Sequence, residues 1–166
     1  MLFRSDVLKR LRANGGLVMA TFVPGFVSQA LRDWLRRSRD AYGKAPVVAD
    51  PKAQLSELET KHGSAPKASL EQVADHIVRL VETAGLDHVG VGSDYFGGAS
   101  PIGLEDVSRF PYLFAELVRR GFSERDLEKM SSKNMLRVLR RVEAVGASLR
   151  KTRSPAIGRL EDYREA

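Results

Sequence analysis

The residues best placed to do chemistry lie in the segment His88-Val-Gly-Val-Gly-Ser-Asp94. Val89 and Val91 predict a short buried strand, and the glycine after each of them, Gly90 and Gly92, permits close approach of another backbone segment. Asp94 follows this strand and precedes a Gly-rich turn. In α/β folds, catalytic carboxylates stand at the carboxyl end of a strand. Asp94 is therefore the candidate catalytic residue, and an Asp that caps a turn is the structural alternative.

Metal-binding and thiol chemistry find little support in the side chains available. The chain has three histidines, and none of them forms a His-x-Asp or His-x-Glu pair. We expect His62, in a Lys-His-Gly-Ser loop, to be solvated. The absence of cysteine from the sequence excludes disulfides, Cys-ligated zinc and thiol nucleophiles.

Alternating helices and strands must position Asp94. Apolar periodicity and capping residues predict helices at about 5–13, 27–39, 69–84, 111–121, 123–130 and 132–146. Continuous apolar runs predict strands at 17–22 and 88–92. The segment 40–68 shows no sustained period, so we expect a long loop with a short helix at about 55–61. We expect Trp34 to anchor the core or an interhelix contact.

This order of elements is typical of a parallel α/β fold. Only two strands are clear, and the chain has 166 residues, whereas a complete (β/α)₈ barrel takes roughly 250 residues. The sequence therefore predicts part of an α/β domain.

Composition excludes several classes of protein. No run approaches the roughly 18 apolar residues of a membrane span. We expect no signal peptide in the first residues, because a charge at Arg4 precedes any apolar stretch. The net charge of +6 is uneven, with nine basic and three acidic residues in 1–44 but nine basic and fourteen acidic in 45–130. No aromatic residues are interleaved with the charges, as nucleic-acid binding would favour. We expect a cytoplasmic protein that binds neither nucleic acid nor membranes.

Several segments of this chain resemble segments of the membrane (renal) dipeptidase family of zinc metallopeptidases, and they occur in the same order along the sequence. The similarity runs from about residue 6 to 145 and is weakest at 40–68. It is carried by Gly15-Gly-Leu-Val-Met-Ala-Thr-Phe22, Gly85-Leu-Asp-His-Val-Gly-Val-Gly-Ser-Asp94, Gly103-Leu-Glu-Asp-Val-Ser-Arg-Phe-Pro111, Ala115-Glu-Leu-Val-Arg-Arg-Gly-Phe-Ser123 and Asn134-Met-Leu-Arg-Val138.

The resemblance implies the C-terminal part of a (β/α)₈ TIM-type barrel that binds two zinc ions and hydrolyses dipeptides. It places a partial barrel at 1–146, with the irregular loop at 40–68, and a polar basic tail at 147–166. Asp94 matches the family's acidic residue beside the metals, which is implicated in proton transfer to the leaving amine and in substrate positioning.

The departures from the family pattern concern its metal and substrate ligands. The family's His-x-Asp pair, bridging Glu and two further His lie upstream of the region covered, so the chain holds none of its metal ligands. His76 and His88 match positions that do not bind metal, which implies structural roles. Arg4 is not at the position of the family's substrate-carboxylate Arg, and Phe96 replaces a second acidic residue common after the catalytic Asp.

These departures lead to two hypotheses from different classes. The first is a C-terminal fragment of a zinc-dependent dipeptidase that is inactive alone. The second is a non-catalytic half-barrel that associates with itself or with a separately encoded N-terminal half, because its uncovered strand edges would leave apolar surface exposed.

Overall fold

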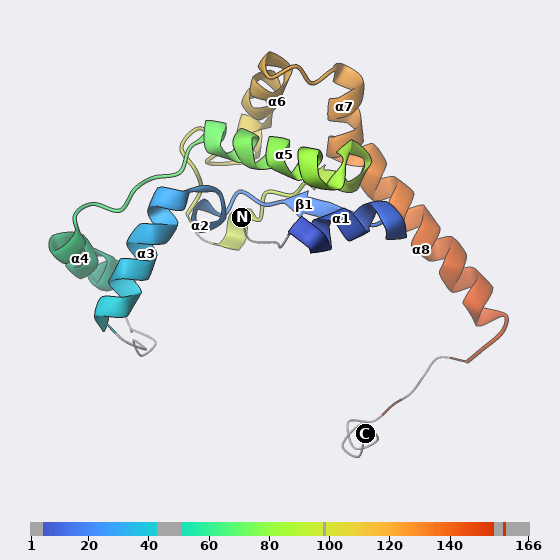
Figure 1. Cartoon of the computed structure of the whole chain (residues 1–166), viewed down its shortest axis with the longest axis horizontal. Helices are drawn as coiled ribbons and strands as arrows, with labels where there is room; N and C mark the ends of the chain where they lie inside the picture. Colours follow the sequence, from blue (N-terminus) through green and yellow to red (C-terminus); the bar gives the residue numbers. More distant parts are fainter. Residues whose placement is uncertain (1–4, 43–50, 98, 155–157, 159–166) are drawn as a thin grey trace.

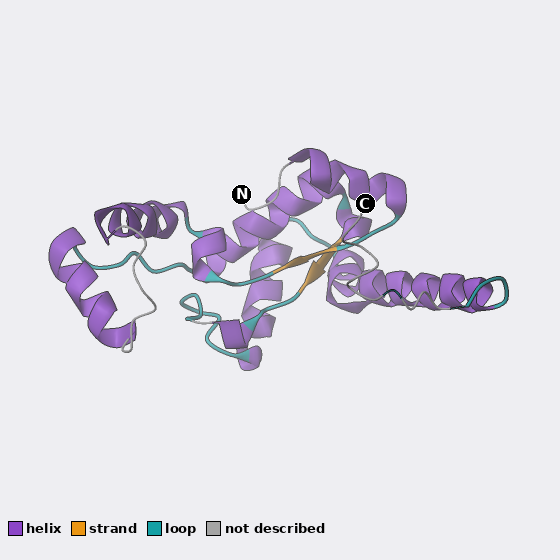
Figure 2. Ribbon diagram, turned by 90° about the horizontal axis from the view of Figure 1, so that it is seen from below, coloured by secondary structure: helices purple, strands orange, loops and turns teal. Residues whose placement is uncertain are grey.

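A computed structural model describes residues 5–42, 51–97, 99–154 and 158 (Figure 1). Two short strands lie among helices that carry most of the described residues (Figure 2). The elements are α1 (Ser5–Asn14), β1 (Val18–Ala20), α2 (Pro24–Val27), α3 (Gln29–Tyr42), α4 (Pro51–His62), α5 (Leu70–Ala84), β2 (Val89–Val91), α6 (Phe110–Arg119), α7 (Glu124–Glu128) and α8 (Asn134–Arg150), with a π-helical turn at Lys129–Lys133.

The strands β1 and β2 are parallel, with Val18 opposite Val89 and Ala20 opposite Val91. The helices α2 to α5 form the connection between them, as a parallel pair requires. The predicted helix and parallel-strand alternation is confirmed. Each strand is shorter than the five or six residues expected, and the described residues form a two-stranded sheet rather than a closed barrel.

The core is centred on α5, which contacts both strands and lies beside α1 and α6 (Figures 1 and 2). Its amphipathic sequence explains this position, because residues at helical spacing are buried on one face. At the amino end of α5, the backbone N–H of Ser69 donates to Gln72 Oε1 at 3.1 Å, as the expected capping box requires. The buried apolar residues of α5 are Leu70, Val73, Ala74, Ile77, Leu80 and Ala84.

The segment expected to be an irregular loop at 40–68 is partly helical. The helix α4 extends over Pro51–His62, longer than the short helix expected at 55–61, and 43–50 lies outside the described residues. Trp34, on α3, is 2% exposed and its Nε1 donates to the carbonyl of Gly63 at 2.9 Å. The predicted interhelix anchor is confirmed, and it connects α3 to the turn that ends α4.

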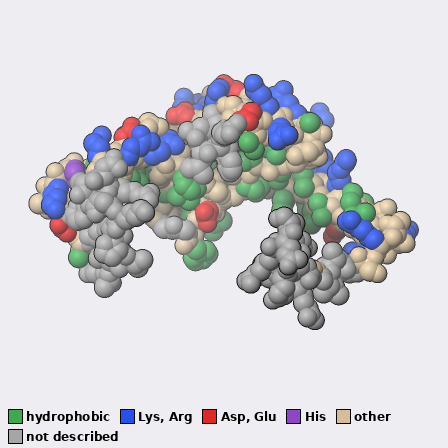
Figure 3. Space-filling view, turned by 60° about the horizontal axis from the view of Figure 1, so that its bottom comes forward, with side chains coloured by type: hydrophobic (Ala, Val, Ile, Leu, Met, Phe, Trp, Pro, Cys, Tyr) green, Lys and Arg blue, Asp and Glu red, His purple; other side chains and the backbone are tan. Residues whose placement is uncertain are grey.

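The last helix, α8, continues to Arg150, four residues past the end expected at 146. In Figure 1 it projects away from the other helices. Figure 3 shows Lys and Arg side chains along the upper edge of the molecule and hydrophobic side chains along its hollowed lower side. No helix in the described part of the chain is long and apolar enough to cross a membrane.

Candidate functional site

Asp94 lies three residues past the carboxyl end of β2 and is exposed. Its φ angle is 59°, the one positive value among the described residues other than glycine. Asp tolerates this left-handed region better than most residues. Left-handed residues occur at functional sites, and Asp also adopts this conformation in ordinary turns, so the backbone of Asp94 fits both the catalytic expectation and the turn alternative.

Hydrogen bonds between the two strands continue beyond β1 and β2, up to the residue before Asp94. The N–H of Gly92 donates to the carbonyl of Ala20 at 3.1 Å, and the N–H of Phe22 donates to the carbonyl of Ser93 at 3.0 Å. These hydrogen bonds connect the loops that follow β1 and β2, directly before Asp94.

An aromatic cluster supports this edge of the sheet. The ring of Phe22 lies 5.8 Å from that of Tyr95 and 5.6 Å from that of Phe110, and Phe110 in turn lies 6.1 Å from Phe114. The hydroxyl of Tyr95 donates to the carbonyl of Asp106 at 2.8 Å. Burial, reinforced by the nearby Asp106 carboxylate, raises the pKa of Tyr95, which keeps its hydroxyl protonated as a donor.

The backbone approach expected at Gly90 and Gly92 is not what the structure shows, because the group that approaches both positions is the side chain of Met19. A Cβ at position 90 would lie 2.6 Å from Met19 Sδ, and one at position 92 would lie 3.2 Å from Met19 Cβ. The thioether of Met19 covers this face of β2, which explains why both positions are glycine.

The three histidines are not brought to Asp94. His88 lies before β2, at the opposite end of the strand, and its Nδ1 is 2.8 Å from the carbonyl oxygen of Gly16. His76 is half-buried on α5, and burial lowers its pKa. The expectation of a solvated His62 is wrong, because that side chain is half-buried and its Nε2 is buried with no partner among the described residues.

The described residues contain no group of three or more His, Asp or Glu side chains that could hold a metal ion. The donor set of this part of the chain therefore does not fit a two-zinc centre. Phe96, at the position of the family's second acid, is fully exposed. Arg4 lies outside the described residues.

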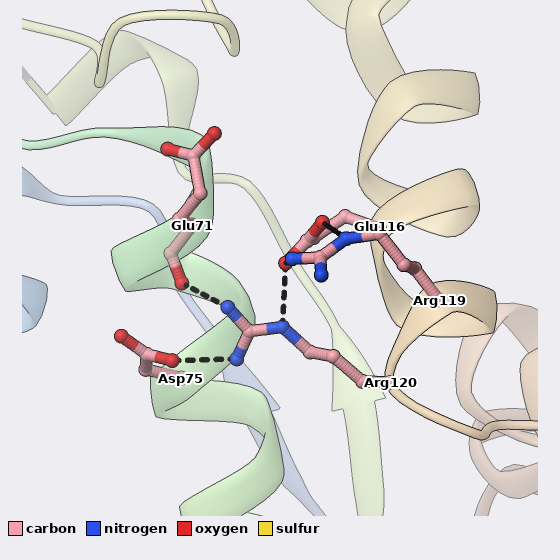
Figure 4. Close-up of polar contacts among 5 residues, drawn as sticks. All are labelled: Glu71, Asp75, Glu116, Arg119 and Arg120. Carbon is pink, nitrogen blue, oxygen red and sulfur yellow. Dashed lines mark hydrogen bonds and ion pairs between the residues drawn. The ribbon is translucent and has the colours of Figure 1, made fainter.

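A second cluster of charged side chains joins α5 to α6 (Figure 4). Arg120 contacts the Asp75 carboxylate at 2.5 Å and the Glu116 carboxylate at 2.7 Å, and it also donates to the carbonyl of Glu71 at 3.1 Å. Arg119 binds both oxygens of Glu116, at 2.8 and 2.7 Å. Because Arg120 on the α6 side binds both the Asp75 carboxylate and the Glu71 carbonyl of α5, the cluster holds the two helices together.

The sequence predicted Asp94 as the candidate catalytic residue, which stays a prediction, and gave no expectation for the aromatic cluster at this edge of the sheet. The signal that could have found the cluster is positional, because Phe22 is the last residue of one predicted strand and Tyr95 closely follows the other. Side chains that follow parallel strands meet at one edge of the sheet. Phe110 is brought in only by tertiary packing.

The sequence matches the family described as Membrane dipeptidase (Peptidase family M19) over residues 3–153. The relative Dipeptidase ataJ of Aspergillus terreus (strain NIH 2624 / FGSC A1156) is 38% identical over 141 residues, which are 84% of this chain and 26% of that protein. Dipeptidase tcpJ of Claviceps purpurea (strain 20.1) is 36% identical over 86% of this chain and 26% of that protein.

A solved structure gives the same indication at the level of the fold. The crystal structure of the probable dipeptidase PvdM from Pseudomonas aeruginosa superposes with a TM-score of 0.60 at 27% identity, covering 81% of this chain and 39% of that one. The chain thus spans about a quarter of the length of the two curated relatives. A match that covers nearly all of the described residues shows that this chain belongs to the membrane dipeptidase family, peptidase family M19.

Proposed function

We propose that this chain is the carboxyl-terminal part of a zinc-dependent dipeptidase with a (β/α)₈ barrel, and that Asp94 is its catalytic carboxylate. The observation that carries the proposal is the left-handed Asp94, held at the carboxyl end of a parallel strand in a chain of this family. In the proposed enzyme, Asp94 transfers a proton to the leaving amine and positions the dipeptide, as the resemblance implies.

The metal ions require residues beyond those described. No group of described side chains fits a metal, and the resemblance places the family's ligands upstream of the region covered. We therefore propose that the zinc ligands belong to polypeptide outside this chain. The 166 residues by themselves are therefore proposed to be inactive. Zinc, when bound by a complete site, would supply an activated water and polarise the scissile carbonyl.

The test compares the chain alone with the chain mixed with the part of Dipeptidase ataJ that lies outside its match. We expect no hydrolysis of L-Ala–L-Ala by the chain alone with zinc, and hydrolysis by the mixture. Asp94→Asn should lower the rate of the mixture by about 10²-fold or more, the range for a lost general acid. Asp87→Asn is the matched control, because Asp87 lies at the opposite end of β2 in an ion pair with Lys129, and it should keep the activity. Hydrolysis by the chain alone contradicts the proposal.

A second candidate function is a non-catalytic half-barrel that works by association. The outer edges of β1 and β2 have no strand partner among the described residues, and Met19 is 37% exposed beside them. Open edges of this kind pair with other chains. Sedimentation equilibrium tests the idea, because a monomer at all concentrations argues against self-association.

A further inference from the structure

A cavity lies at the amino end of β2, the end opposite Asp94. It has a volume of about 520 Å³, and its walls come from the turn before β2, from α7, from the π-helical turn and from α8. We call it the basic pocket, because its lining contains four basic side chains and one acidic one. The basic residues are Arg125, Lys129, Lys133 and Arg137, and the acidic residue is Asp87.

The four basic residues recur every fourth residue along one continuous helical stretch. α7, the π-helical turn and α8 follow one another without a break (Figure 1). Residues four apart share a face of a helix, so this spacing places a cation about every 6 Å along the stretch. Like charges at this spacing destabilise a helix, and π turns are frequent at functional sites. Both features favour a binding role over a purely structural one.

Two of the cations keep their charge uncompensated. Arg137 donates from Nη1 to the carbonyl of Gly15 at 2.9 Å and from Nη2 to the carbonyl of Asp87 at 2.6 Å. Neutral carbonyls fix the orientation of the guanidinium but do not cancel its charge, and they leave three of its five N–H groups unused. Arg125 makes no ion pair among the described residues. The pocket therefore presents one rigidly held cation and one exposed cation to a ligand.

The two lysines have carboxylate partners that a stronger anion can replace. Lys129 contacts Asp87 at 2.7 Å, and Lys133 contacts Glu128. The side chain of Asp87 is 60% exposed and that of Glu128 is 49% exposed, and exposed ion pairs contribute little. With both carboxylates included, four positive charges meet two negative ones, which leaves a net charge of +2.

We propose that the basic pocket binds an oligophosphate chain, either free or carried by a nucleotide. The stripe of cations extends over about 18 Å of helix, so a chain of phosphate groups reaches several cations where a single phosphate reaches only the nearest. Arginine pairs with phosphate oxygens through its planar fork, and lysine does so as a point charge. The cavity volume lies within the roughly 300–1,000 Å³ that small-molecule sites occupy.

The basic pocket is complete within this chain, since every side chain that lines it is described. Strands that extend a sheet pair at its outer edges, whereas this pocket lies at the end of a strand. The inference goes beyond the proposed function, because the pocket contains no residue of the Asp94 site and needs no zinc. It concerns the chain by itself, which is the protein to be tested.

The experiment is isothermal titration calorimetry of the full chain at constant ionic strength, in buffer without divalent metal ions. We expect tripolyphosphate to bind at one site per chain, at least tenfold more tightly than sulfate. ATP distinguishes the two sources of the phosphate chain. Binding of ATP as tight as that of tripolyphosphate, or tighter, indicates a nucleotide, and weaker binding indicates a free oligophosphate. The absence of saturable binding of tripolyphosphate, or equal affinity for sulfate, overturns the proposal.

Two double variants locate the binding. Arg125→Gln/Lys133→Gln should weaken tripolyphosphate binding at least tenfold, and it leaves Lys129 and Arg137 with their structural contacts. Arg79→Gln/Arg150→Gln is the control, because it removes the same net charge outside the pocket from two exposed side chains. It should change the affinity less than twofold. An equal loss in both variants would indicate a general effect of charge and overturns the proposal.

A third variant should improve binding, which a loss of folding cannot do. Asp87→Asn removes the one carboxylate that lines the pocket and releases Lys129 from its ion pair. Tripolyphosphate should then bind at least threefold more tightly than it does to the wild type. An unchanged or weaker affinity overturns the proposal. Hydrolysis assays of the Asp94 site are independent of all these outcomes.

Discussion

Asn134 donates its side-chain N–H to the carbonyl of Val89, the first residue of β2, at 2.9 Å. The same amide donates to the carbonyl of Leu86 at 2.8 Å. Asn134 is the first residue of α8 and is 3% exposed. One buried side chain therefore fixes where α8 begins relative to the strand that leads to Asp94.

Replacing Asn134 with Ala should destabilise the chain by about 1–3 kcal/mol, because the carbonyls of Leu86 and Val89 each lose a hydrogen bond in a buried region. The free energy of unfolding in urea measures the effect. Glu143→Gln, an exposed change on the same helix, is the control and should stay within about 0.5 kcal/mol of the wild type. Equal stability of the Asn134→Ala variant would show that water replaces the amide.

The left-handed backbone of Asp94 predicts an order of stability among its variants. Asp94→Gly should be more stable than Asp94→Ala by about 1 kcal/mol, since Gly enters the positive-φ region without the steric cost that Ala bears. Urea denaturation of both variants provides the measurement. If Ala is as stable as Gly at this position, the φ of 59° does not describe the protein in solution.

The contact between Gly90 and Met19 predicts a rescue. Gly90→Ala should cost about 1–3 kcal/mol of unfolding free energy, because the new methyl group overlaps the Met19 thioether. Truncation of that side chain in Gly90→Ala/Met19→Ala should recover most of the loss. The control is Gly146→Ala, where the nearest atom to the new Cβ is 3.5 Å away on the end of Arg150, and it should be neutral or stabilising. Additive losses in the double variant would refute the contact.

The carboxylate of Glu116 predicts a pH dependence of stability. Hydrogen bonds from Arg119 and then Arg120 lower its pKa from 4.5 to about 2. Since the folded pKa is the lower one, the contribution of Glu116 is full above about pH 4.5 and is lost as the pH falls toward 2. The urea midpoint should therefore differ between wild type and Glu116→Gln at pH 6, and the difference should shrink in acid.

The corresponding control removes the cations and keeps the carboxylate. In Arg119→Gln/Arg120→Gln, the substitution of Glu116 should produce a smaller difference at pH 6, and that difference should change less between pH 6 and pH 3. A wild-type difference that stays constant down to pH 3 would contradict the lowered pKa.

Local sequence signals predicted most of the helices correctly. The Ser69–Gln72 pair and the apolar spacing after it specify α5 without reference to any other element, and Gly85 ends the helix with a positive φ of 91°. Trp34 was also predicted as an anchor, although its partner, the carbonyl of Gly63, lies 29 residues away. Such a partner is set by tertiary packing.

The candidate site was predictable only in part. A strand followed by Asp predicts where the carboxylate lies, but its left-handed φ depends on the surrounding fold. The segment at 40–68 has weak periodicity, and α4 has almost no amphipathic face, so its length could not be read from a pattern. Half-burial of His62 likewise depends on contacts distant in sequence.

The hydrogen bond between the Tyr95 hydroxyl and the Asp106 carbonyl joins the start of the loop after Asp94 to its end. The segment that carries Asp94 is thus held by contacts within this chain. In the proposed enzyme, it would not depend on the polypeptide that brings the metal ligands. The conformational entropy of this segment is lost when the chain folds. Assembly of the proposed enzyme would then join two pre-organised surfaces. Such binding is tighter than binding that must also order a loop, because less conformational entropy is lost on association.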